Sequence, residues 1–226
     1  MQFASRTKII SAAITLPFIF ACSSATDAGI RRPVNLSLAA VTSSASASSA
    51  ATAALQITSL KLLVNQASLG SGDQFGCQDC SGNDGSNAVG TVGGVVSVPL
   101  DGSPVNLATE QVQPGSYPQV EVELGGSTAP SWPSGQTVEI QGSNNGVLFT
   151  IGVPVDGSFR ENLVPAVVVT TSSPASIPVT ITLPVASWFV SGGAALDPAV
   201  PAQRAQIEAN IRTAFSGPES TVAAEQ

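Results

Sequence analysis

The residues of this sequence with the clearest chemical potential are Cys77 and Cys80, which are separated by Gln78 and Asp79. Two thiols at this spacing can form a local disulfide, act as a redox pair, or supply part of a metal site. A redox pair usually lies at a helix N-terminus beside a parallel strand, whereas these cysteines lie in a stretch rich in Gly, Asp, Ser and Asn. A structural zinc site needs four ligands, and apart from Cys22 the chain has no other cysteine and no histidine. A disulfide is therefore the preferred interpretation, with redox chemistry and metal binding as the alternatives.

Oxygen-bearing side chains of the same stretch make Ca²⁺ a further candidate ligand. The side chains concerned are Asp73, Asp79, Asn83, Asp84 and Asn87. An EF-hand frame starting at Asp79 has Asp84 where the motif needs glycine and Gly90 where it needs a bidentate glutamate. We therefore prefer a solvated, turn-rich loop and expect no metal or other cofactor.

Three aromatic residues, Trp132, Tyr117 and Phe75, are candidates for a sugar-stacking surface. Trp132 lies in a polar loop between Pro130 and Pro133, where it either stacks on a ligand or packs against the edge of the core. Core packing is the preferred interpretation, and a carbohydrate-binding module acting on cell-wall or surface glycans is the alternative function.

Catalysis lacks its usual residues in this chain. Without histidine, Ser-His-Asp and Cys-His arrangements are excluded in their common forms, and no G-x-S-x-G motif occurs. Glu121, Glu123 and Glu139 are candidates for a pair of catalytic carboxylates. Alternation along their strands predicts that they lie on a solvated face, so we expect no enzymatic activity.

The amino end predicts export. Arg6 and Lys8 precede an apolar run, 9–20, that is shorter than the about 20 residues needed to span a bilayer. The segment 19–22, Ile-Phe-Ala-Cys, resembles the lipobox of bacterial lipoproteins. The resemblance implies cleavage before Cys22, fatty acylation of Cys22, and attachment to a membrane. An ordinary secreted protein with a chance cysteine is the alternative.

Export would place Cys77 and Cys80 in an oxidising compartment, which favours their disulfide. By resemblance to known sorting rules, Ser23 favours the periplasmic face of the outer membrane. The mature chain would keep six basic and 15 acidic residues. Nucleic acid is therefore not an expected partner, because phosphate binding needs several Lys or Arg on one face.

The pattern of the remaining chain predicts a mainly β fold. We expect a signal peptide over 1–21, a lipidated cysteine with a flexible Ser/Ala-rich tether over 22–53, one β domain over 54–215, and a disordered tail over 216–226. The first strand, 55–69, needs a bulge near Thr58 and Ser59, because its apolar residues change phase there. The other expected strands are 92–100, 105–108, 117–124, 137–141, 147–153, 159–164, 167–170 and 178–185.

Shorter signals complete the expected architecture. Asn145-Gly146 between alternating runs predicts a hairpin, and Trp188 and Phe189 are expected in the core. Asp197 followed by proline predicts the start of a helix over about 199–215. Together these elements predict a single β-sandwich, immunoglobulin-like or transthyretin-like with Greek-key connections, and a short C-terminal α-helix.

Several segments resemble an uncharacterised family of bacterial envelope lipoproteins with a β-sandwich domain. These segments are 57–62, 104–108, 112–117, 179–183, Trp188-Phe189, Asp197-Pro198 and Asn210-Ile211. The resemblance implies no reaction. Our expectation is a membrane-anchored protein with a structural or binding role, serving as an accessory subunit with a protein partner in the envelope.

Overall fold

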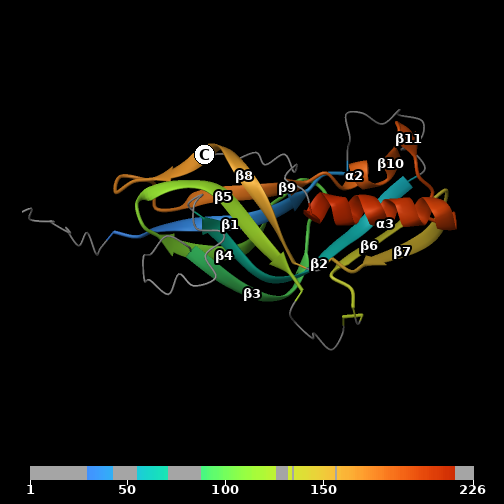
Figure 1. The fold of residues 1–226 in the computed structure, drawn as a ribbon, viewed down its shortest axis with the longest axis horizontal. Helices are drawn as coiled ribbons and strands as arrows, with labels where there is room; N and C mark the ends of the chain where they lie inside the picture. Colours follow the sequence, from blue (N-terminus) through green and yellow to red (C-terminus); the bar gives the residue numbers. More distant parts are fainter. Residues whose placement is uncertain are drawn as a thin grey trace, which may run out of the picture.

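The computed structural model describes residues 30–42, 55–70, 88–125, 132–133, 135–155 and 157–216, with only the backbone at 88–91. These residues form two main β-sheets in which most strand pairs are antiparallel, a small two-stranded sheet and a C-terminal helix (Figure 1). The expected mainly β fold with a C-terminal helix is therefore confirmed.

The larger sheet is organised around one long strand, β2 (Leu55–Gly70). One edge of β2 pairs first with β6 and then with β5, while its other edge pairs with β3. Strand β7 pairs with the other edge of β6, and β8 pairs with the other edge of β5. The bounds of these strands are β3 (Ala88–Ser97), β5 (Gly115–Leu124), β6 (Val138–Asn144), β7 (Val147–Val153) and β8 (Gly157–Val169).

The expected bulge in β2 is confirmed. The register between β2 and β6 shifts between Ile57 and Ser59. The extra residue restores the phase, so that Leu60 and Leu62 are buried although their parity in the sequence differs from that of Ile57.

The smaller sheet corrects one expectation. Its central strand, β1 (Arg32–Ala40), lies between β4 (Val105–Val112) and β9 (Ile177–Leu183), antiparallel to β4 and parallel to β9. Val34 and Leu38 are fully buried. The prediction of a flexible tether over 22–53 is therefore wrong for 32–40. Its two partner strands come much later in the chain, so local composition did not reveal the pairing.

Both main sheets contribute to one hydrophobic core, which the C-terminal segments close at one end. The segments concerned are α2 (Val185–Trp188), the hairpin of β10 (Val190–Ser191) and β11 (Ala194–Ala195), and α3 (Pro201–Ser216). The ring of Phe215 lies 5.2 Å from that of Phe159 on β8 and 5.7 Å from that of Trp188. Trp188 and Phe189 are each 1% exposed, which confirms their expected place in the core.

Helix α3 begins slightly later than expected. The carboxylate of Asp197 accepts a hydrogen bond from the Ala199 N–H at 2.9 Å, so it caps the turn that precedes the helix. Ile207, Ile211 and Phe215 are buried, as their spacing predicted. None of the helices in the described ranges is long and apolar enough to cross a membrane.

Strand β8 replaces two expected strands, 159–164 and 167–170. Pro165 lies between the two expected strands, and proline lacks a backbone donor. Within the described part of the chain β8 pairs only with β5 and forms the end of the sheet. An edge strand tolerates proline, because the missing donor can lie on its unpaired side.

The burial of β1 predicts a large effect of shortening one of its side chains. Leu38→Ala should lower the free energy of unfolding by about 2–5 kcal/mol, because it leaves a cavity between the sheets. Ser37→Ala, on the opposite face of the same strand, is the control and should change it by less than about 1 kcal/mol. Urea unfolding of both variants measures this, and equal stability of Leu38→Ala and the parent chain would contradict the place of β1 in the core.

Candidate functional site

Several predicted site residues lie outside the described part of the chain. These are Cys22, Asp73, Phe75, Cys77, Asp79, Cys80, Asn83 and Asp84. Acylation of Cys22, the Cys77–Cys80 disulfide and the Ca²⁺ alternative therefore stay predictions. Among the described residues, no group of three or more Cys, Asp or Glu side chains could hold a metal ion.

Tyr117 lies in the core instead of on a ligand-binding surface. Its side chain is 3% exposed, and its hydroxyl donates a hydrogen bond of 2.8 Å to the backbone carbonyl of Gln113. This contact fixes the corner between β4 and β5, as a tyrosine corner does in β-sandwich domains. Burial raises the pKa of the phenol, while Arg31 and the Gln113 contact lower it by a smaller amount. The expectation that Tyr117 stacks on a sugar is wrong.

Trp132 is half-buried in the connection that leads into β6. Its indole N–H donates a hydrogen bond to the backbone carbonyl of Gln136. Gly152 leaves room for the side chain of Gln136, because a Cβ added at position 152 would be only 1.9 Å from the Gln136 Oε1. Among the described residues, the carbohydrate-binding alternative therefore depends on Trp132 alone.

Glu139 is 8% exposed, so the expectation that it lies on a solvated face is wrong. Its carboxylate is 3.1 Å from the Lys61 Nζ and accepts a hydrogen bond of 3.0 Å from the Gln141 amide. The neighbouring β2 strand supplies the lysine directly opposite Glu139. These contacts satisfy a carboxylate that is largely removed from water.

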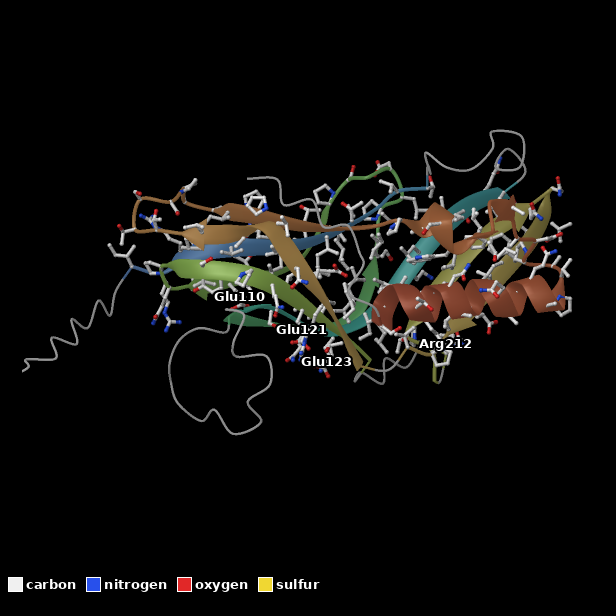
Figure 2. The ribbon with its side chains drawn as sticks, turned by 45° about the horizontal axis from the view of Figure 1, so that its top comes forward. Glu110, Glu121, Glu123 and Arg212 are labelled. Atoms are coloured by element: carbon white, nitrogen blue, oxygen red, sulfur yellow. The ribbon has the colours of Figure 1, made fainter. Side chains whose placement is uncertain are left out.

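Glu121 and Glu123 lie on β5, which pairs with a later part of β2 than the part that pairs with β6 (Figure 2). The Glu121 carboxylate is 3.3 Å from the Arg160 Nε. Glu121 lies opposite Ser68 of β2, and Glu139 lies opposite Lys61. This offset of seven positions corresponds to about 23 Å along a strand. Glycosidase carboxylates are about 5–10 Å apart, so Glu121 and Glu139 do not form such a pair.

Glu161 is a buried carboxylate that the sequence analysis did not single out. It is 1% exposed on β8, between the buried residues Phe159 and Leu163. The alternation of these apolar residues placed position 161 on the inward face. The pattern of the strand therefore contained the signal for its burial.

A pocket lies at the end of the molecule formed by the β6–β7 hairpin. Asn145 and Gly146 both have positive φ, 51° and 80°, as a tight two-residue turn requires, and the predicted hairpin is confirmed. Strand β7 pairs only with β6 among the described strands. Its other edge faces the residues around the start of α3.

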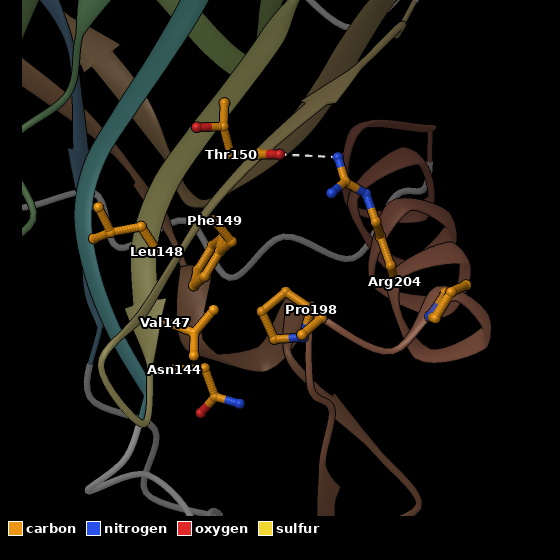
Figure 3. A pocket seen from close by; sticks show the side chains of 9 residues that line it. Asn144, Val147, Leu148, Phe149, Thr150, Pro198 and Arg204 are labelled. Atoms are coloured by element: carbon orange, nitrogen blue, oxygen red, sulfur yellow. Dashed lines mark hydrogen bonds between the residues drawn. The ribbon is translucent and has the colours of Figure 1, made fainter.

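Arg204 of α3 contacts this edge of β7. Its Nη2 donates a hydrogen bond of 2.8 Å to the backbone carbonyl of Thr150, shown as a dashed line in Figure 3. Its Nε lies 3.4 Å from the Glu208 carboxylate one turn further along the helix. The guanidinium is therefore held between a sheet edge and a helix, with its side chain 41% exposed.

The pocket between β7 and the start of α3 has a volume of about 370 Å³. Its lining consists of Asn144, Val147, Leu148, Phe149, Thr150, Pro198, Ala199, Pro201 and Arg204. The lining is mostly apolar, and among the described residues that form it Arg204 is the one with a charge. Leu148 is 84% exposed, Val147 60%, and Val200 beside the pocket 40%. We call these three residues together with the pocket the hairpin surface.

Phe149 gives the pocket a fixed inner wall. Its ring lies over Gly142 of β6, where an added Cβ would be only 2.7 Å from the Phe149 Cζ. The ring centre is 5.8 Å from that of the buried Phe189. The missing side chain at position 142 therefore allows Phe149 to pack on the core from the edge strand.

A second pocket of about 400 Å³ lies beside the first residues of β2. Its lining consists of Thr42, Leu55, Gln56, Ile57, Thr58, Ala186, Phe189, Val190 and Ala195. Among the described residues that line the two pockets, none is a nucleophile with an adjacent base. The sequence contained one signal for the first pocket, because 147–149 is an uninterrupted apolar run in a strand that otherwise alternates.

Comparison of the chain with protein-family models, curated proteins and solved structures gave no match.

The burial of Tyr117 predicts a stability effect at high pH. Because its pKa is raised, the neutral phenol stabilises the fold below pH about 10, and this contribution is lost as the pH rises through the raised pKa. Tyr117→Phe should lower the free energy of unfolding by about 1 kcal/mol at neutral pH and should lack this alkaline loss.

Urea unfolding between neutral and strongly alkaline pH measures both effects. Tyr117 is the single tyrosine of the chain, so its ionisation can be followed directly by ultraviolet absorbance. A parallel alkaline loss in the parent chain and in Tyr117→Phe would show that other groups cause it.

Proposed function

We propose that this protein is a lipid-anchored component of the bacterial envelope whose β domain binds another envelope protein without catalysing a reaction. The observation that carries the binding role is the hairpin surface, where exposed apolar side chains surround a pocket at one end of the molecule. Contiguous exposed apolar residues of this kind are typical of interaction sites. An accessory subunit of an envelope complex would use such a surface.

The arrangement of the ends supports the anchored form of the proposal. Strand β1 begins at Arg32, ten positions after Cys22, which limits the link to about 36 Å. In Figure 1 the start of β1 and the β6–β7 hairpin lie at opposite ends of the long axis. An acyl chain on Cys22 would therefore hold one end of the domain near the bilayer and leave the hairpin surface directed away from it.

We also propose that the domain is a β-sandwich of the immunoglobulin-like or transthyretin-like kind with Greek-key connections. The shared core of the two main sheets and the corner contact of Tyr117 support this assignment. The parallel pairing of β1 with β9 brings an early strand beside a late one. In such a scaffold the sheets hold the surface residues in place and supply no reactive group of their own.

The ion pairs support a non-catalytic role. Lys61 pairs with Glu139 and Arg160 pairs with Glu121, so these carboxylates are engaged in contacts within the sheet. Neither glutamate lines either of the two pockets described above. The hairpin surface instead offers apolar contacts and one guanidinium, which suits recognition of a protein.

Removal of the thiol at position 22 tests the anchor. Cys22→Ser should move the protein from the membrane fraction to the soluble fraction of cells, because no acyl chain can then be attached. Mass spectrometry of the wild-type amino terminus should show a fatty-acylated Cys22. An unmodified Cys22 on exported protein would refute the anchored form of the proposal.

A charge on the hairpin tests the binding surface. Leu148→Asp should reduce the amount of the co-purified protein at least about tenfold, because it puts a carboxylate into an apolar contact. Val164→Asp is the matched control, since Val164 is 80% exposed on β8 and does not line this pocket. Purification from detergent-solubilised membranes, with identification of the bound chains, measures the difference. Equal recovery with both variants would place the contact elsewhere.

A further inference from the structure

The hairpin surface combines an apolar pocket with a strand edge that no other described strand pairs with, and the two together specify what kind of partner fits. Building on the binding role proposed above, we infer that an extended peptide segment carrying a carboxylate adds to β7 as a new strand. Its acidic side chain would pair with Arg204. Peptides bind other proteins in this way by combining backbone hydrogen bonds with side-chain pockets.

The register of the hairpin shows which backbone groups are available. Asn144 and Val147 flank the two-residue turn and face each other, so the next residues alternate between groups directed at β6 and groups directed outward. This pattern directs the N–H and C=O of Leu148 and Thr150 away from β6. The hydrogen bond from Arg204 to the Thr150 carbonyl confirms the outward direction at that position.

Strand β7 itself carries none of the residues that usually protect an edge, although Arg204 and the start of α3 lie beside it. Its sequence, Val-Leu-Phe-Thr-Ile-Gly-Val, has no charged residue and no proline, and such residues normally prevent edge-to-edge pairing. Arg204 is the charged side chain that contacts this edge. A strand edge without charged residues or proline of its own, beside an apolar pocket, suits a strand from a partner.

The charge of the pocket selects the partner. Arg204 is the charged residue among the described residues of the lining, whereas the whole chain has a net charge of −7. An incoming strand would donate its own N–H to the Thr150 carbonyl and displace the guanidinium. The Arg204 Nε keeps its contact with Glu208, whereas the displaced Nη2 needs a new acceptor. A carboxylate on the peptide supplies a stronger hydrogen bond than the carbonyl that Nη2 lost.

A second copy of the chain is a poorer occupant. Antiparallel pairing of two β7 strands about Thr150 would bring two Arg204 guanidinium groups to the same junction. Like charges placed close together oppose association. The charge of this edge therefore favours a partner segment of opposite charge over self-association.

The test uses two fluorescein-labelled, capped peptides as long as β7. One alternates valine and threonine around a central aspartate, and the other has asparagine in its place. Fluorescence polarisation with the purified exported chain measures the affinity of each. We expect the aspartate peptide to bind about tenfold more tightly, because its carboxylate accepts a charge-assisted hydrogen bond.

Two variants separate the side-chain contact from strand addition. Arg204→Ala should abolish the preference for aspartate over asparagine. Thr150→Pro removes an outward N–H that β6 does not use, and should weaken both peptides at least about tenfold. Arg212→Ala is the control, since Arg212 also lies beside Glu208 and does not line the pocket.

A direct measurement complements the variants in case Thr150→Pro fails to fold. Binding of the aspartate peptide should slow hydrogen exchange at the amides of Leu148 and Thr150, and should leave the exposed Val164 region of β8 unchanged. Equal affinity for both peptides, a preference that survives Arg204→Ala, or unprotected amides would overturn the inference. Concentration-dependent dimerisation that Leu148→Asp abolishes would identify a second copy as the occupant and would overturn it too.

These outcomes are separate from those of the proposed function. Peptide binding by a chain whose Cys22 is unmodified would refute the anchor and leave the inference standing. Leu148-dependent recovery of a partner, together with failure of both peptides, would refute strand addition and leave the binding role standing.

Discussion

Backbone pairing along β2 is the constraint on which the rest of the structure depends. None of its described partner strands pairs along all 16 of its residues. Strands β6 and β5 pair with successive parts of one edge of β2, and β3 pairs with the other edge. The bulge after Ile57 lies within the part paired with β6 and keeps the apolar side chains of β2 on the core face. A second irregularity, between Val64 and Gln66, occurs against both β3 and β5.

This arrangement explains why the hairpin surface exists. The β6–β7 hairpin pairs with the first half of β2 through β6. Strands β1, β4 and β9 of the smaller sheet pair with one another and with no strand of the hairpin. Helix α3 packs Ile207, Ile211 and Phe215 into the core and thereby fixes its first turn beside β7. Arg204 is three and seven positions before Ile207 and Ile211, so it lies on the same side of the helix, and burial of that side brings it to the Thr150 carbonyl.

Local patterns in the sequence predicted the individual elements well. Period-two alternation predicted β5, β7 and β9, and Asn145-Gly146 predicted the tight turn because both positions need left-handed backbone angles. The predictions failed where a distant partner decides the outcome. Residues 32–40 fell within the predicted Ser/Ala-rich tether, and Tyr117 was a candidate for a sugar-stacking surface. Their burial depends on strands and a corner that only the assembled sheets bring together.

The sequence by itself determined the elements that local interactions encode, namely the strands with their phase, the bulge in β2, the buried stripe of α3 and the signal-like amino end. It also limited the chemistry, because a chain without histidine lacks the commonest general base. Only the tertiary structure decided which sides of these elements meet. Pairing of Glu139 with Lys61, burial of β1 and the placement of Arg204 beside β7 all join residues far apart in the chain. Such contacts depend on sheet register and helix docking, which the periodicity of a single segment does not specify.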